Sequence, residues 1–549
     1  MARPPIQGAA GARQSQRAAA SKRPPAERRR SPSSARVDLG ADAGTITLTV
    51  MRAMVASSDA LRSYLETHNV VALSAADLAS PGSTLAELAR HYQSALRHFV
   101  KDWLRDRRQM AWRVDAFSGR TLAIDDDAAQ RGALAADTDI VLAEDQPLHG
   151  IRQRSAREGL GIPVAARTRR AAPDPVLDPA RTTAARPWTV LVSVAGHDDR
   201  RLRRVRIEIL DPGEAPDFLL GATRVPLAAD FTAPVALTLG LERRPAAIAY
   251  GLRGTTRRGT VEGFSALTPF GLQRAPLVLM EGVGLSLTTM AQLTNEVAAD
   301  PLLRSQYQVW LYRYPVTAPL CYAARAFRAD LERFAARFAG ATGRDPQGRV
   351  TVIARGAGAV IAKSLLADCG TALWNAIFSV APQRLDVDAR DRVLLDGLLR
   401  WHRAAEIDRI VVLDEPRSAE ALLAGVGTRA VQLLLRQPAE LRGAIERIYG
   451  REKAHLAAPS PTQGASSTGA HDADAHPEPV CAAVAAAALA TDRALLALVA
   501  DDGRHPEDAK LYRGGAGLRA VESLPAGAAG IPGELPAVRR ALEWLRPPP

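Results

Sequence analysis

Hydrophobic and polar positions follow different patterns in the two halves of this chain. In the first half, Ile46–Leu65 and Leu85–Arg108 place apolar residues three and four positions apart, which predicts two amphipathic helices. Residues 188–194 (W-T-V-L-V-S-V) and 205–210 (V-R-I-E-I-L) alternate as strands do, and D-P-G-E at 211–214 predicts a turn after the second. The first half therefore predicts an α+β region.

The second half alternates short apolar runs with helical segments, which predicts a mostly parallel sheet with helices on both faces. The expected strands are 276–280, 307–314, 350–354, 409–413, 494–500 and 518–524. The fold class expected is thus α/β, preceded by the α+β region. The expected domain organisation is a disordered basic tail (1–40), an N-terminal region (41–270), and an α/β domain (271–549) with a flexible insert at about 456–480.

Composition agrees with a folded protein of more than one unit, because 549 residues at 47% hydrophobic content bury at least one large core. The three cysteines, Cys321, Cys369 and Cys481, show no metal-ligand spacing and no disulfide framework. There is no apolar run long enough for a transmembrane segment and no apolar core of a signal peptide near the N-terminus. These features predict a protein of the cytoplasm.

The positive charge of the chain is concentrated at its beginning. Residues 1–36 hold nine Lys and Arg residues and one acidic residue, Glu27, so they carry +8 of the formal net charge of +12. A Pro, Ala, Ser and Arg composition of this kind predicts a solvated tail, with weak contacts to nucleic acid or anionic lipid as the alternative. A specific nucleic-acid partner is not expected.

Residues 350–364, V-T-V-I-A-R-G-A-G-A-V-I-A-K-S, read as an apolar strand, a glycine-rich corner and a helix. A G-x-S-x-G sequence on such a corner holds the nucleophilic serine of α/β-hydrolases. The serine position is taken here by Gly356, which has no side chain to attack a substrate.

From about Pro276 onward, the chain resembles bacterial lipase- or esterase-like α/β-hydrolases. The strings that carry the resemblance are 276–286 (P-L-V-L-M-E-G-V-G-L-S), 309–315 (V-W-L-Y-R-Y-P), 352–359 (V-I-A-R-G-A-G-A), 366–370 (L-A-D-C-G) and 373–380 (L-W-N-A-I-F-S-V), with upstream matches at 156–164 and 225–234. The resemblance implies an α/β-hydrolase fold and covers most of residues 45–549.

The resemblance also implies where the catalytic groups should stand. Active relatives have a histidine before the glycine of an H-G turn, and Glu281 takes its place here, before Gly282. Gly282 and Ala357 would help form the oxyanion hole, and the carboxylate of Glu281 puts a negative charge beside it. Asp502, in D-G-R-H-P, corresponds to the acid, and Ala528 takes the place of the histidine base.

Other residues could replace the missing groups. Ser286 and Ser379 are alternative nucleophiles, Ser364 lies too far along the helix, and His505 is an alternative base. The leading hypothesis is nevertheless a pseudoenzyme that binds an unknown small molecule or protein, because loss of serine and histidine together removes the triad mechanism. The rival hypothesis is an active carboxylic-ester hydrolase with a displaced nucleophile.

A third class of function would use the corner as an anion site. Arg355, Gly356 and Gly358 could hold a phosphate or carboxylate at the start of the helix, although close packing of strand against helix also explains the small residues. No third glycine completes a dinucleotide motif, so no cofactor is expected. His471 and His476, with Asp472 and Asp474, lie in the flexible insert and do not predict a metal site.

Deletion of residues 1–36 should leave the melting temperature nearly unchanged, because a solvated tail contributes no packing. It should also lower retention on heparin, and the retention of the full chain should fall steeply with salt because exposed charges are screened within about 8 Å at physiological ionic strength. A truncated chain that melts several degrees lower would show that the tail packs on the folded part.

Overall fold

The computed structural model describes residues 41–106, 115–117, 120–126, 138–148, 150–168, 184–199, 202–242, 263–280, 288–314, 320–346, 348–355, 357–368, 370–413, 439–452, 455, 494–501, 518–525 and 534–546. The chain divides into two compact units, Met1–Leu48 and Thr49–Pro549. Of the first unit, only the helical backbone of residues 41–48 is described. Both large sheets belong to the second unit.

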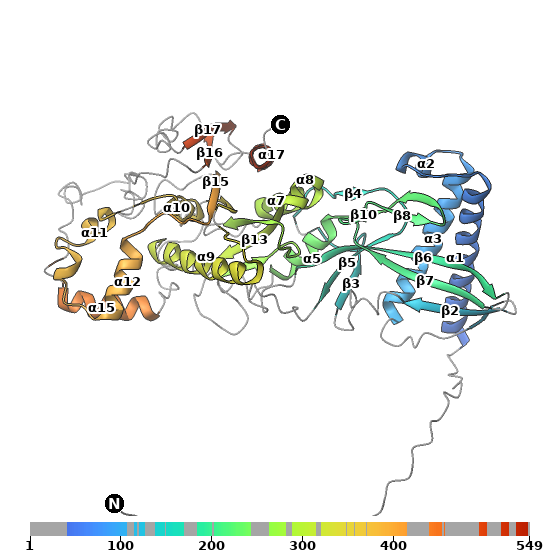
Figure 1. The fold of residues 1–549 in the computed structure, drawn as a ribbon, viewed down its shortest axis with the longest axis horizontal. Helices are drawn as coiled ribbons and strands as arrows, with labels where there is room; N and C mark the ends of the chain where they lie inside the picture. Colours follow the sequence, from blue (N-terminus) through green and yellow to red (C-terminus); the bar gives the residue numbers. More distant parts are fainter. Residues whose placement is uncertain are drawn as a thin grey trace, which may run out of the picture. The chain divides into compact units, whose positions relative to one another are not determined.

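The N-terminal sheet has six strands in the order β1-β2-β7-β6-β5-β3 (Figure 1). Neighbouring strands are antiparallel except β2 and β7, which run parallel. The strands are β1 (Asp115–Phe117), β2 (Arg120–Asp126), β3 (Thr138–Leu142), β5 (Ile162–Thr168), β6 (Arg186–Asp199) and β7 (Leu202–Leu210). Two small antiparallel pairs accompany it: β4 (Ala156–Arg157) with β10 (Ala229–Asp230), and β8 (Asp217–Leu220) with β9 (Thr223–Pro226).

Helices α1 (Ala41–Thr67) and α3 (Thr84–Asp106) pack on this sheet, with the short α2 (Ala75–Ala79) between them in sequence. The apolar positions predicted for the second helix, among them Leu96, Phe99 and Trp103, are buried against strand residues such as Val190 and Ile207. Periodicity thus predicted both the helix and the face that it buries.

The second sheet has seven strands in the order β11-β13-β12-β14-β15-β16-β17. All neighbouring pairs are parallel except β11 and β13. The strands are β11 (Gly263–Ala266), β12 (Ala275–Met280), β13 (Tyr307–Arg313), β14 (Val350–Ala354), β15 (Ile407–Leu413), β16 (Ala494–Asp501) and β17 (Leu518–Pro525). Every residue of β14 is buried, as expected for a parallel strand that is covered on both faces.

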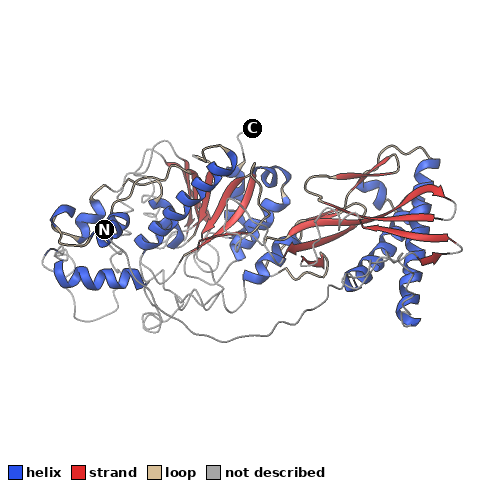
Figure 2. Cartoon of the chain, turned by 60° about the horizontal axis from the view of Figure 1, so that its bottom comes forward, coloured by secondary structure: helices blue, strands red, loops and turns tan. Residues whose placement is uncertain are grey.

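Helices cover both faces of this sheet (Figure 2). One face packs on α9 (Leu320–Thr342), α10 (Ala357–Ser364), α11 (Ala372–Ile377) and α12 (Ala389–Leu399), together with α15 (Ala439–Glu452). The other face packs on α5 (Thr232–Glu242), α7 (Thr288–Ala299), α8 (Pro301–Gln306) and α17 (Glu534–Leu545). A short 3₁₀ helix, η2 (Pro382–Arg384), precedes α12.

The structure confirms the six strands predicted in the second half and the alternating strands β6 and β7 in the first. It adds β1, β2, β3 and β5, which the sequence pattern did not predict, and β11, an antiparallel edge strand that precedes the expected boundary at residue 271. The tail at 1–40 and the insert at 456–480 lie outside the described residues. None of the described helices is both long enough and apolar enough to cross a membrane.

Tyr92 connects α3 to the N-terminal sheet at a fully buried position. Its hydroxyl donates to the carbonyl oxygen of Val192 at 2.9 Å and accepts from the amide nitrogen of the same residue at 3.3 Å. Burial raises the pKa of the Tyr92 phenol, so the hydroxyl keeps its proton and can donate at any physiological pH.

Replacement of Tyr92 by Phe should lower the free energy of unfolding by about 1 kcal/mol, because both hydrogen bonds are lost in a buried site. Tyr64→Phe on the half-exposed face of α1 is the matched control and should change stability little. Urea denaturation followed by far-UV circular dichroism measures both. Equal stability of the two variants would contradict the role given to the buried hydroxyl.

Candidate functional site

The strand ends of the parallel sheet bring two sequence-predicted regions together. Met280, the last residue of β12, pairs with Ala354, the last residue of β14, so both strands end at the same edge. Glu281 and Gly282 follow the first strand in sequence, and Gly356 lies between β14 and the start of α10 at Ala357. The sheet therefore brings the chain segments that enter the predicted oxyanion region and the predicted nucleophile corner side by side.

Most of the sequence-predicted catalytic positions are outside the described residues. These positions are Glu281, Gly282, Gly356, Asp502 and Ala528, and the alternatives Ser286 and His505. Of Ala357, only the helical backbone is described. The roles assigned to these residues by the resemblance therefore stay predictions.

The corner itself is held by main-chain contacts with β12. The amide nitrogen of Arg355 donates to the carbonyl oxygen of Met280 at 2.9 Å, and the amide nitrogen of Gly358 donates to the carbonyl oxygen of Arg355 at 3.1 Å. A Cβ atom on Gly358 would lie 2.8 Å from the carbonyl oxygen of Met280 and 2.9 Å from its Cγ. Only glycine permits this approach of α10 to β12, which supports the close-packing explanation of the small residues.

A partly buried cation lies at the end of the neighbouring strand. Arg313, the last residue of β13, donates from Nη1 to Ser265 Oγ at 3.2 Å. Burial lowers the pKa of its guanidinium to about 10, which still leaves it charged at neutral pH. With Arg355, it places two arginines at the carboxyl edge of the parallel strands, where open α/β sheets bind their ligands.

Ser379, the alternative nucleophile that the structure describes, and Ser364 both donate to main-chain carbonyls. Ser364 Oγ is buried and donates to the carbonyl oxygen of Ile361 at 2.6 Å, within α10. Ser379 Oγ donates to the carbonyl oxygen of His455 at 3.0 Å, and the Ser379 amide nitrogen donates to the same oxygen at 2.9 Å. These bonds give both serines a structural role.

An acid–imidazole pair lies beside Ser379, and sequence reasoning missed it. His455 Nδ1 lies 2.6 Å from Glu452 Oε2, while Glu452 Oε1 accepts from the amide nitrogen of Asp386 at 2.7 Å. The hydrogen bond with His455 lowers the pKa of the buried Glu452 carboxyl. The available signal was the E-x-x-H spacing, in which His455 follows three residues after Glu452, the last residue of α15.

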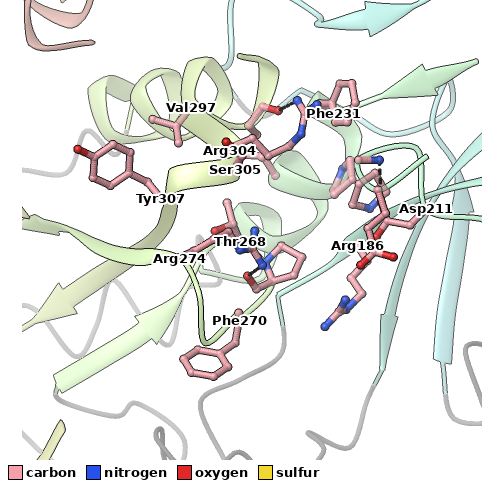
Figure 3. Close-up of a pocket in the computed structure, with 18 of the residues that line it drawn as sticks. Arg186, Asp211, Phe231, Thr268, Phe270, Arg274, Val297, Arg304, Ser305 and Tyr307 are labelled. Atoms are coloured by element: carbon pink, nitrogen blue, oxygen red, sulfur yellow. Dashed lines mark hydrogen bonds between the residues drawn. The ribbon is translucent and has the colours of Figure 1, made fainter. Parts of the chain in front are cut away.

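A pocket lies at the opposite edge of the sheet, near the amino ends of β12 and β13 (Figure 3). Its volume is about 370 Å³, within the range of small-molecule sites. It is lined by the start of β6, the turn after β7, α5, the β11–β12 loop, and the segment from α7 to β13. Arg186, Arg274 and Arg304 are the cationic side chains on its walls, and Asp211 and Glu214 the anionic ones. No sequence motif marked this pocket.

Among the described residues, no group of three or more His, Cys, Asp or Glu side chains is arranged to hold a metal ion. Cys321, the cysteine that the structure describes, is buried.

Comparisons with known proteins give distant structural neighbours. Neither a protein-family model nor a curated protein matches the sequence. Esterase 2 of Thermogutta terrifontis, phosphonylated by sarin, is 11% identical over 50% of this chain and 85% of its own, with a TM-score of 0.26. An inhibited esterase B from Lactobacillus rhamnosis is 10% identical over 56% of this chain and 94% of its own, with a TM-score of 0.27. At these values, neither likeness assigns an activity to this chain.

Gly358→Ala should destabilise the protein by about 1–3 kcal/mol, because the added Cβ must displace Met280 or the start of α10. The matched control is Gly340→Ala near the end of α9, where a Cβ meets no atom within 4 Å. That control should stabilise by about 0.4–1 kcal/mol, since alanine has less freedom in the unfolded chain. Differential scanning calorimetry compares the two, and a Gly358→Ala variant as stable as the control would refute the close contact.

Proposed function

We propose that this chain is an α/β-hydrolase-like protein that has lost ester hydrolysis and acts by binding a ligand. The observation that carries the proposal is the residue between β14 and α10, where a hydrolase needs a nucleophile and this chain has Gly356. The packing of Gly358 on Met280 supports it, because the frame of such a corner is retained without the reacting side chain.

The base is also missing from its expected position, although Asp502 corresponds to the acid. Ala528 takes the place of the base, and Glu281 would place a negative charge near a developing oxyanion. Loss of the serine or the histidine alone lowers the rate of a triad enzyme about 10⁶-fold. A protein with neither, and with a well-formed pocket elsewhere, is better suited to binding than to turnover.

One observation favours a second candidate function. Ser379, His455 and Glu452 belong to one hydrogen-bonded cluster, and these are the residue types of a hydrolytic triad. The hydroxyl of Ser379, however, donates to a main-chain carbonyl, whereas a nucleophile must give its proton to the imidazole. This candidate is a carboxylic-ester hydrolase with a displaced site, and it ranks below the binding protein.

The purified full-length chain should not hydrolyse p-nitrophenyl acetate or butyrate above a blank without protein, and a fluorophosphonate probe should not label it. Both follow from the absence of an activated serine. Ser379→Ala and Ser364→Ala variants serve as paired controls for any signal. Turnover or labelling that disappears in Ser379→Ala and persists in Ser364→Ala would replace the proposal with the displaced-site hydrolase.

A further inference from the structure

The three arginines of the pocket at the amino edge of the sheet lack carboxylate partners. In the described part of the chain, Arg186, Arg274 and Arg304 form no salt bridge with an acidic side chain. Arg186 is exposed, whereas Arg274 and Arg304 are partly buried. Partly buried guanidinium groups are usually paired, because transfer of an unpaired charge away from water is costly. The arrangement therefore leaves positive charge on the pocket walls.

Arg304 is held in place by contacts that leave part of its donor capacity unused. Its Nη1 donates to the carbonyl oxygens of Ala298 at 2.7 Å and Ala299 at 3.2 Å, at the end of α7. Its guanidinium carbon lies 4.0 Å from the ring centroid of Phe231. No partner of its Nε or Nη2 occurs among the described residues, so these groups are available to a bound anion.

Arg274 is held by its own loop in the same way. Its Nη2 donates to the carbonyl oxygen of Pro269 at 2.5 Å, which fixes the guanidinium within the β11–β12 loop. Figure 3 shows Arg274 with Thr268 and Phe270 below Arg304 and Phe231. Burial, and then the positive charge of Arg186, lower the pKa of Arg274. The positive charges of the pocket thus repel one another in the absence of an anion.

The acidic residues of the pocket reduce its positive charge but form no salt bridge with the arginines among the described residues. Burial lowers the pKa of Arg274 and Arg304, and the negative charge of Asp211 partly offsets this effect at both. Figure 3 places Asp211 beside Arg186. Asp211 Oδ1 accepts from the amide nitrogen of Gly213 at 2.8 Å, and burial raises the pKa of this carboxyl. Glu214, on the same turn, is exposed to solvent, which weakens its electrostatic effect.

We propose that this pocket binds a small amphiphilic anion, whose carboxylate or phosphate group lies between Arg274 and Arg304 and whose apolar part packs on the surrounding walls. Planar guanidinium groups match both headgroups with paired hydrogen bonds. The apolar walls are supplied by Phe231, Val235, Leu267, Phe270, Leu272 and Val297. The inference deepens the proposed function, since it names the ligand class for a protein that acts by binding.

This pocket is separate from the predicted catalytic corner. It is lined by Arg274, which directly precedes β12, and by Tyr307, the first residue of β13, whereas the corner meets the other end of β12 at Met280. Six residues of strand separate the two edges by roughly 17 Å. An anion bound here would not need a nucleophile at Gly356.

Isothermal titration calorimetry with octanoate, octyl phosphate and octanamide tests the proposal on the full-length chain. Octanoate or octyl phosphate should bind, and the difference between them identifies the preferred headgroup. Octanamide has a similar apolar chain and no charge, so it should bind at least about tenfold more weakly, as expected for loss of a charge-assisted hydrogen bond.

Two variants test the arginines, and a third serves as the matched control. Arg304→Met and Arg274→Met should each weaken binding about tenfold or more. Arg349→Met removes a half-buried arginine that also lies over a phenylalanine ring, 5.3 Å from Phe338 and outside the pocket, and should bind like the wild type. Thermal melting of each variant establishes that it is folded before titration.

The proposal is overturned if neither anion binds at millimolar concentration, or if both arginine variants bind as tightly as Arg349→Met. Binding of octanamide as tight as that of octanoate would also overturn it, because the pocket would then be merely apolar. If Arg304→Met does not fold, Arg274→Met decides, since its side chain holds only a loop carbonyl. Esterase activity has no bearing on these outcomes, so failure here leaves the proposed loss of catalysis standing on its own test.

Discussion

The parallel pairing of β12 with both β13 and β14 determines at which edge of the sheet the strand ends and their loops lie. Because these strands share direction, all their carboxyl ends reach one edge and all their amino ends reach the other. The same pairing requires connections that cross a face of the sheet, and they contain α7 and α8 between β12 and β13 and α9 between β13 and β14. The corner at Gly358 therefore lies at the carboxyl edge of the sheet, and the arginine pocket lies at the amino edge.

The packing at the corner can be explained without catalysis. The contact between Gly358 and Met280 depends on the absence of a Cβ atom and on no property of a nucleophile. Packing alone therefore requires a glycine at position 358, whereas a serine two positions earlier, at 356, would be required only for catalysis. A close strand–helix contact is accordingly poor evidence of activity, and the identity of residue 356 is better evidence.

Sequence reasoning performed well where burial determines the pattern. The runs that became β12, β14 and β15 are buried on both faces, so they appear as uninterrupted apolar stretches. It missed β3 and β5, whose mixed burial gives no clear alternation, and it missed the pocket entirely. Arg186, Arg274 and Arg304 stand far apart in sequence, so only the tertiary fold relates them. The triad positions stay predictions, because they lie outside the described residues.

The short strand β11 has a consequence for self-association. An edge strand offers unpaired amide and carbonyl groups that can recruit a strand from another molecule. Here that edge is four residues long, antiparallel to its neighbour, and each of its residues is buried. A second chain therefore cannot reach the main chain of β11 without first displacing what covers it. On this side, the parallel sheet is protected against growth by addition of strands.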